Sequence, residues 1–135
     1  MHQGHQEAGP VSNEVDQIGR AVVDAALKVH RALGPGLLES VYEACLAEEL
    51  KRRGFGVERH VGVPVSYGDI RIDVGLRLDL LIGGQVVVEI KAIDALASIH
   101  EAQLLTYLRF SRVRLGYLIN FNSVLLKNAI RRMIL

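Results

Sequence analysis

Residues 70–91 alternate apolar and polar side chains with a period of two, which is the pattern of two half-buried β-strands. Every even position from 70 to 80 is apolar, and the odd positions carry four charged residues and a glycine. After the turn sequence Gly83-Gly84, the even positions 86, 88 and 90 are again apolar. We expect the even positions to face the core, so that Asp79, Glu89 and Lys91 project together from the other face.

The two strands share this face only if the loop that joins them has an odd length. A two-residue loop at the two glycines would pair Asp79 with Val88 and would place Glu89 on the opposite face. A three-residue hairpin with a left-handed glycine, or a bulge, restores the match. We therefore predict an irregular turn around 82–84 that brings Asp79 close to Val87 and Glu89.

Two carboxylates held close together without a counter-charge repel each other, and a metal ion or a shifted protonation state usually stabilises such a pair. Asp79, Glu89 and the backbone carbonyl of Ile90 offer three oxygen ligands of the kind that Mg²⁺ prefers. Lys91 would lie beside a metal-bound water and help to orient or activate it. The alternative is an ordinary solvated hairpin face on which Lys91 pairs with the acids. The spacing alone favours this alternative, because short acid and lysine patterns are common.

The rest of the chain predicts helices on both sides of these strands. The expected elements are, in order, helices at 12–33 and 37–53, strands at 55–67, 70–82 and 85–93, a helix from about 98, and a strand at 113–121. Gly-Pro-Gly at 34–36 separates the first two helices, and Ser98 with Glu101 matches a capping box. The segment 124–135 is either an edge strand or a short helix. The fold class is therefore α/β, in the sense of an α+β fold with a mixed sheet.

Composition favours one compact domain. At 135 residues, half of them apolar, the chain has the usual size for a single core, which we assign to 13–135 after a flexible N-terminal tail at 1–12. Cys45 is the only cysteine, which excludes an internal disulfide and fits a reducing compartment. No apolar run approaches the roughly 18 residues of a membrane helix, and no signal-peptide pattern is present. We expect a cytoplasmic protein without a membrane partner.

The second expected helix carries Glu39 and Tyr42 three residues apart, and therefore on one helical face. With Gly36 they form the pattern G-x-x-E-x-x-Y, and "DLLI", "VVVEIKAI" and "HEAQLLTYL" follow later in the chain. On these residues the sequence resembles the GxxExxY proteins, a family assigned to the PD-(D/E)xK nuclease superfamily, from Ile18 to the C-terminus. One departure is Leu78, which stands where the name of the superfamily has proline.

The resemblance implies a restriction-endonuclease-like core in the order helix, three strands, helix, strand, with an additional N-terminal helix. It also implies a set of roles: metal ligation by Asp79 and Glu89, assistance to the attacking water by Lys91, positioning of Lys91 or of a water by Gln103, outer-shell metal ligation by Glu39, and support of Glu39 by Tyr42. Mg²⁺ or Mn²⁺ is the implied cofactor. A surface glutamine that bonds only to solvent is the alternative for Gln103.

We therefore expect a metal-dependent nuclease-like enzyme that hydrolyses phosphodiester bonds of nucleic acid, with DNA favoured, through a metal-activated water. Candidate contacts to the nucleic-acid backbone are Lys51, Arg52, Arg53, Arg109 and Arg112, although an ordinary solvated face explains each cluster equally well. The alternative function is a catalytically inactive module of the same fold that binds nucleic acid or a protein partner. A homodimer formed through the apolar segment 124–135 is a further hypothesis.

Overall fold

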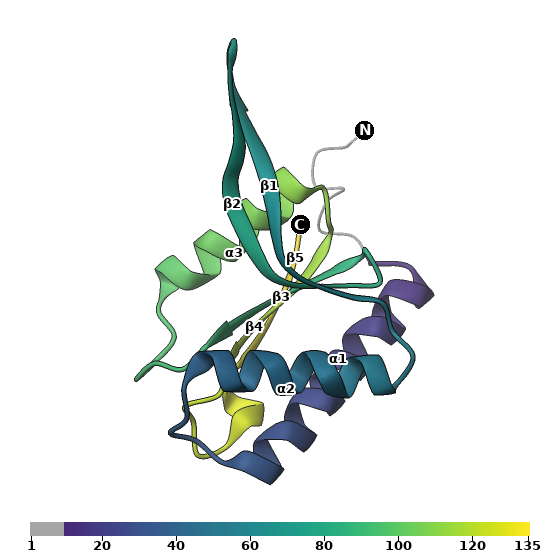
Figure 1. The fold of residues 1–135 in the computed structure, drawn as a ribbon, viewed down its shortest axis with the longest axis vertical. Helices are drawn as coiled ribbons and strands as arrows, with labels where there is room; N and C mark the ends of the chain where they lie inside the picture. Colours follow the sequence, from purple (N-terminus) through teal and green to yellow (C-terminus); the bar gives the residue numbers. More distant parts are fainter. Residues whose placement is uncertain (1–9) are drawn as a thin grey trace.

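The computed structural model describes residues 10–135 and shows a five-stranded sheet with helices on both faces (Figure 1). The helices are α1 (Asn13–Leu33), α2 (Glu39–Arg52) and α3 (Ser98–Ser111), and η2 (Leu126–Ala129) is a 3₁₀ turn. The strands are β1 (Val57–Tyr67), β2 (Ile70–Ile82), β3 (Val86–Lys91), β4 (Leu115–Asn120) and β5 (Ile130–Ile134). This order confirms the predicted fold class. Within the described residues, no helix is long and apolar enough to cross a membrane.

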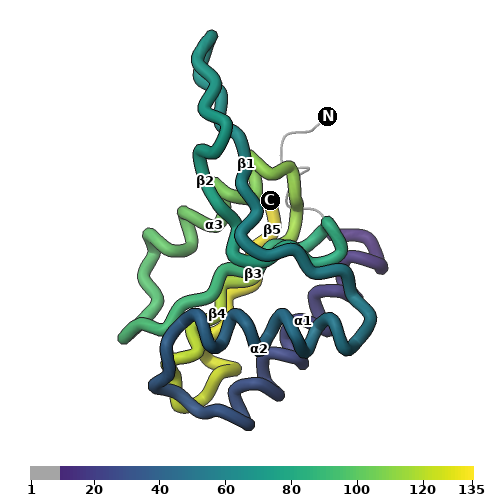
Figure 2. The backbone as a smooth tube through the Cα atoms, in the orientation of Figure 1, coloured from purple at the N-terminus to yellow at the C-terminus, as the bar shows by residue number. Residues whose placement is uncertain are grey.

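The sheet is mixed, with its strands in the order β1-β2-β3-β4-β5. β3 and β4 run parallel because α3 connects them as a crossover, and the other neighbouring pairs are antiparallel (Figure 2). These two central strands are buried along their whole length except at Lys91. A central position between two helical layers explains why both strands are almost continuously apolar.

Two separate cores lie on the two faces of the sheet. On one face, α1 and α2 pack on the even positions of β3, and Tyr42, Leu46 and Leu50 are completely buried there. On the other face, α3 packs Leu104 and Leu108 against the odd positions of β3 and the even positions of β4. The charged residues at the odd positions of β3 therefore lie on the α3 side of the sheet.

The turn between β2 and β3 is the irregular one that the alternation predicts. Ile82 pairs with Val86, so the loop 83–85 has three residues. Both of its glycines are left-handed, with φ angles of 59° and 67°. The predicted odd-length loop is therefore confirmed. If the same register is continued by one residue, Asp79 lies opposite Glu89, whereas the sequence predicted a position near both Val87 and Glu89.

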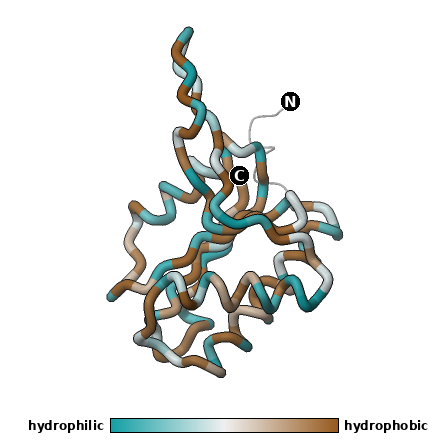
Figure 3. The backbone as a smooth tube through the Cα atoms, in the orientation of Figure 1, coloured by the Kyte–Doolittle hydropathy of each residue, from teal (hydrophilic) through white to brown (hydrophobic). Residues whose placement is uncertain are grey.

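β1 and β2 extend beyond the body of the protein as a two-stranded arm, which in β2 includes residues 70–74 (Figures 1 and 3). The expectation that every even position of β2 faces the core is wrong for this arm, where Ile70, Ile72 and Val74 are 59%, 50% and 53% exposed. The reason is that β3 pairs only with residues 80–82 of β2. Within residues 10–135 no third strand lies beside the arm, so its apolar side chains remain in contact with solvent.

The two ends of the chain refine the predicted boundaries. Residues 1–9 of the predicted tail lie outside the described residues, and Ser12 caps α1 by accepting the Val15 N–H at 3.2 Å. The segment 124–135 contains both predicted alternatives in succession, a 3₁₀ turn and then β5 at the edge of the sheet. Leu126 and Ala129 are buried in the body of the protein. The proposed homodimer through this segment stays a prediction.

The capping box predicted at Ser98 and Glu101 is wrong by one residue. The N-cap of α3 is Ala97, whose N–H donates to Nδ1 of His100 at 2.9 Å. An imidazole nitrogen therefore takes the place of the carboxylate that a capping box normally supplies.

Candidate functional site

Asp79 and Glu89 hold each other in place through two backbone hydrogen bonds. The Asp79 N–H donates to Oε2 of Glu89 at 2.9 Å, and the Ile90 N–H donates to Oδ2 of Asp79 at 2.8 Å. Regular pairing between the two strands ends at Leu80 and Val88, and Asp79 and Glu89 are the next residues away from the turn. Where β2 separates from β3, the two carboxylates therefore accept the hydrogen bonds of backbone N–H groups. The sequence prediction that the two carboxylates lie together agrees with this geometry.

Each carboxylate keeps one oxygen without a hydrogen-bond partner in the described part of the chain, Oδ1 on Asp79 and Oε1 on Glu89. Within residues 10–135, every completely buried side-chain oxygen or nitrogen has a partner. These two oxygens therefore retain contact with solvent, although Glu89 as a residue is only 5% exposed. The pair presents two adjacent oxygen ligands to anything that enters from solvent.

The protonation of this pair is strongly perturbed. Burial, and then the negative charge of Asp79, raise the pKa of Glu89 from 4.5 to about 8. Burial also raises the pKa of Asp79, although the hydrogen bond from the Ile90 N–H opposes that change. The two acids therefore resist being charged at the same time, and a bound cation would relieve that repulsion.

Lys91 lies two residues after Glu89 and on the same side of β3. Its positive charge acts to lower the pKa of Asp79 and of Glu89, so it belongs to the same electrostatic environment. Within residues 10–135, however, its ammonium forms no ion pair with either acid. The geometry therefore does not support the alternative in which Lys91 simply neutralises the hairpin face.

Glu39 reaches this site from the first turn of α2. Burial and then the charge of Asp79 raise its pKa, whereas Lys91 and the Ala92 N–H lower it. Glu39 is an exposed residue, so a water molecule has room beside its carboxyl group. The predicted outer position of Glu39, near but not beside the acid pair, is compatible with this arrangement.

Tyr42 fixes the loop from which α2 begins. Its hydroxyl donates to the Gly34 carbonyl at 2.6 Å and accepts the Leu37 N–H at 3.0 Å. The ring is completely buried and stacks on Phe121 with 4.7 Å between ring centroids. Tyr42 therefore does not contact the acids, but it sets the point at which α2 starts and hence the position of Glu39.

Tyr107 is a residue of α3 whose hydroxyl lies in the electrostatic field of the acid pair. Burial, and then the charges of Glu89 and Asp79, raise the pKa of the Tyr107 hydroxyl, so this side chain lies near the acid pair. Gln103, one turn earlier, is exposed and has no hydrogen bond within the described residues. Its predicted contact with Lys91 or with a water stays a prediction.

Three site residues were missed by sequence reasoning. Oε2 of the buried Glu43 accepts hydrogen bonds from Nε and Nη2 of Arg59 at 3.2 and 3.0 Å. The same oxygen lies 2.6 Å from Nε2 of His60. The charge of Glu43 raises the pKa of Asp79 and of Glu89, which places it beside the acid pair. One signal was available, because Glu43 follows Glu39 by four residues and therefore lies on the same face of α2.

The donor set of the acid pair fits Mg²⁺ or Mn²⁺. Within residues 10–135, no three His, Cys, Asp or Glu side chains are grouped closely enough to hold a metal ion. A zinc site, which needs at least three protein ligands, does not fit. Mg²⁺ usually takes one or two protein carboxylates and fills its remaining positions with water and substrate phosphate. The free oxygens of Asp79 and Glu89 match that requirement.

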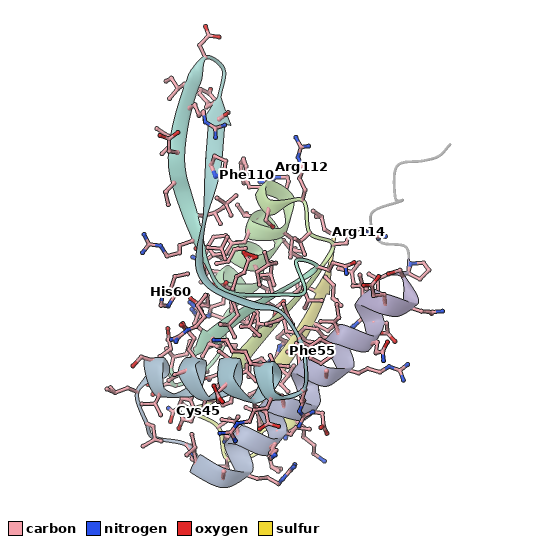
Figure 4. All side chains as sticks on the ribbon, turned by 45° about the vertical axis from the view of Figure 1, so that its right-hand side comes forward. Cys45, Phe55, His60, Phe110, Arg112 and Arg114 are labelled. Atoms are coloured by element: carbon pink, nitrogen blue, oxygen red, sulfur yellow. The ribbon has the colours of Figure 1, made fainter. Side chains whose placement is uncertain are left out.

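The basic residues predicted to contact nucleic acid lie at the C-terminal ends of α2 and α3. Lys51 follows Glu39 by twelve residues, which corresponds to about 18 Å along a helix. Arg52 is paired with Glu48, and Arg53 with Asp24 and Glu49. Two further candidates, Arg109 and Arg112, lie at the C-terminal end of α3, where Figure 4 labels Arg112. Arg109 lies over the ring of Phe110. Binding of nucleic acid by these five residues stays a prediction.

Comparison with known proteins places the site in a family. Curated proteins and solved structures give no match to this chain. The family model described as the PD-(D/E)XK nuclease superfamily matches residues 16–133, a range that includes all the site residues described above. The match covers most of the 135 residues, and this chain therefore belongs to the PD-(D/E)XK nuclease superfamily.

Proposed function

We propose that this protein is a metal-dependent nuclease that hydrolyses phosphodiester bonds of nucleic acid, with DNA as the favoured substrate. The observation that carries the proposal is the acid pair, in which Asp79 and Glu89 fix each other through the backbone and each keep one free oxygen. Membership in a superfamily of nucleases supports the same reaction class. The G-x-x-E-x-x-Y pattern further suggests the GxxExxY proteins as the subgroup.

A divalent cation bound by Asp79 and Glu89 would polarise the scissile phosphate and lower the pKa of a water molecule. The side chains around it have separate tasks. Lys91, which forms no ion pair within the described residues, stabilises the charge that develops on the phosphate and orients the attacking water. We assign the Ile90 carbonyl as a third inner ligand, Glu39 as an outer ligand, and Gln103 as a residue that positions Lys91 or the water.

A second function has two observations in its favour. Within residues 10–135 there is no preformed group of three ligand side chains, and the raised pKa of Glu89, about 8, keeps this group largely protonated at neutral pH when no cation is bound. A catalytically inactive module that uses the same fold to bind nucleic acid or a protein would tolerate both properties.

The test measures cleavage and metal binding side by side. Plasmid, linear duplex, single-stranded and branched DNA, and RNA, are incubated with wild type, Asp79→Asn and Lys91→Ala in Mg²⁺ or Mn²⁺. The matched control is Asp73→Asn, an aspartate on the same strand whose side chain is 90% exposed. We expect wild type and Asp73→Asn to cleave equally, and each of the other two variants to lose roughly 100-fold or more in rate.

Two other outcomes are informative. Cleavage that survives in Asp79→Asn and Lys91→Ala would come from a contaminating enzyme or from another site. A wild type that cleaves nothing, and whose melting temperature does not change in millimolar Mg²⁺ or Mn²⁺, would support the binding module, because a ligand bound to the folded state must raise its stability.

A further inference from the structure

The strand β2 changes its orientation at Asp79. Leu80 and Ile82 pack in the core formed with α1 and α2, whereas Leu78 packs in the core formed with α3. Residues two apart in a regular strand lie on the same face. The strand therefore turns over between Leu78 and Leu80, and this turn directs Asp79 toward β3.

The neighbouring strand is distorted at the matching position. Arg59 pairs with Leu80 and Val61 pairs with Leu78, so His60 lies opposite Asp79. The φ angle of His60 is 55°, and among the described residues only one other residue that is not glycine has a positive φ. A left-handed backbone is unfavourable for a residue that has a β-carbon. Some interaction must therefore hold His60 in this conformation.

Glu43 supplies that interaction from α2. Its carboxyl group is buried, and its Oε2 contacts both His60, where the backbone is distorted, and Arg59, the residue before it. His60 lies at the base of the arm and faces α2 (Figure 4). Because Glu43 is one helical turn after Glu39, a single carboxylate connects the helix that carries Glu39 to the strand distortion that directs Asp79.

We propose that Glu43 and His60 are positioning residues that fix the geometry of the acid pair. The Glu43 carboxylate holds the His60 side chain, and the left-handed backbone of His60 turns β2 over so that Asp79 meets Glu89 and the Ile90 N–H. Nε2 of His60 contacts Oε2 of Glu43, and in this proposal His60 acts on Asp79 through its backbone conformation. The consequence for metal binding rests on the proposed function, but the two hydrogen bonds of the acid pair join protein atoms alone and can be followed separately.

Two substitutions at one position separate a backbone role from a side-chain role. Glycine tolerates a positive φ, so His60→Gly keeps the distortion without needing Glu43. Alanine lacks both this tolerance and the imidazole, so His60→Ala lets the backbone relax. Amide hydrogen exchange of Asp79 and Ile90 is measured in metal-free protein. We expect His60→Ala to lower the protection of both amides about tenfold and His60→Gly to preserve it.

Mn²⁺ binding, measured by calorimetry, extends the test to the proposed site. We expect His60→Ala and Glu43→Gln each to weaken Mn²⁺ binding by about tenfold, and His60→Gly to stay within about twofold of wild type. Adding Glu43→Gln to His60→Gly should cost much less than Glu43→Gln costs alone, since the two residues act as one unit. Glu48→Gln on the same helix, whose partner Arg52 is exposed, is the matched control.

Each result decides the proposal. Equal losses in His60→Gly and His60→Ala would show that the imidazole acts directly and would overturn the backbone role. Unchanged exchange of Asp79 and Ile90 in His60→Ala would overturn it as well. A wild type that binds no Mn²⁺, but whose variants show the expected exchange pattern, would contradict the proposed nuclease function and leave the positioning role in place.

Discussion

The two halves of β2 share one sequence pattern but occupy opposite environments. In the arm, from Ile70 to Val74, apolar side chains at even positions are half exposed. At the base, from Leu78 to Ile82, the even positions are completely buried, and Asp79 is drawn partly inside with them. Water therefore contacts apolar side chains in one half of the strand, while the Asp79 side chain is partly withdrawn from water in the other half.

The difference arises from what lies beside the strand. The base of β2 pairs with β3 and is covered by helices on both faces, whereas among residues 10–135 only β1 pairs with the arm. Burial at the base raises the pKa of Asp79 and Glu89 and so makes the acid pair chemically unusual. Alternation in a sequence predicts a two-faced strand, but the neighbours of the strand decide whether either face is buried.

Truncating one apolar side chain in each half should give the largest contrast. Leu78→Ala removes a completely buried side chain and should lower the free energy of unfolding by about 2–4 kcal/mol, from lost burial and from the cavity left behind. Ile72→Ala in the arm should change it by less than about 0.5 kcal/mol. Urea denaturation of both variants measures the difference. Similar losses would mean that the arm is covered in solution and would remove the contrast.

The second prediction concerns the cost of charge at the base. The pKa of Glu89 is about 8 in the folded protein against an ordinary value of 4.5. Between these values the folded state binds a proton that the unfolded state has released, so the contribution of Glu89 to the stability of metal-free wild type falls as pH rises from 4.5 to 8. Glu89→Gln removes this contribution. We expect it to raise the free energy of unfolding by about 1–3 kcal/mol at pH 8, and to give no gain at pH 4.

Thermal or urea unfolding across this pH range, without divalent metal, measures the effect. Asp73→Asn in the arm is the control, because its side chain is 90% exposed and its charge stays in water. A curve of stability against pH for Glu89→Gln that is parallel to that of wild type would show that the surroundings do not shift the pKa of Glu89. Base and arm would then not differ in their effect on charged groups.

The third prediction compares the buried and exposed tyrosines. Tyr42→Phe leaves the Leu37 N–H and the Gly34 carbonyl without the partner that they have in wild type. We expect a loss of about 1–2 kcal/mol in the free energy of unfolding and a weaker contribution of Glu39 to the site. Tyr67→Phe should be neutral, because Tyr67 is 84% exposed at the tip of the arm. Equal effects of the two substitutions in urea denaturation would contradict the assigned role of Tyr42.

Much of the fold was predictable because it depends on local rules. The alternation of even and odd positions, together with two glycines, predicted both the three-residue loop and the closeness of Asp79 to Glu89. Period and turn residues also predicted the order of the elements. These features depend on residues that are neighbours in the sequence, so the sequence alone predicts them.

The rest depends on contacts between distant residues. The cluster of Glu43, Arg59 and His60 joins a helix to a strand, and nothing in either segment alone marks the pairing. The positive φ of His60 was also invisible, since glycine or asparagine usually marks such positions. Exposure of the arm was missed because the alternation in β2 does not record where β3 stops pairing. Glu43 was the one residue that a helical-face argument from Glu39 could have found.

The smallest expected effect comes from an ion pair in the arm. It compares an exposed ion pair of the arm with a partly buried ion pair at the base. Arg71 and Asp73 form a pair whose side chains are 64% and 90% exposed, so Arg71→Ala should change the free energy of unfolding by no more than about 0.5 kcal/mol. At the base, Arg59→Ala removes a partner from Glu43, whose side chain is only 8% exposed, and should cost about 1 kcal/mol or more. Urea denaturation at low and high salt separates the two cases, because salt screens the exposed pair and acts less on the buried carboxylate. If Arg71→Ala costs as much as Arg59→Ala, solvent exposure does not set the strength of these pairs, and the arm must be ordered by contacts that the isolated chain does not show.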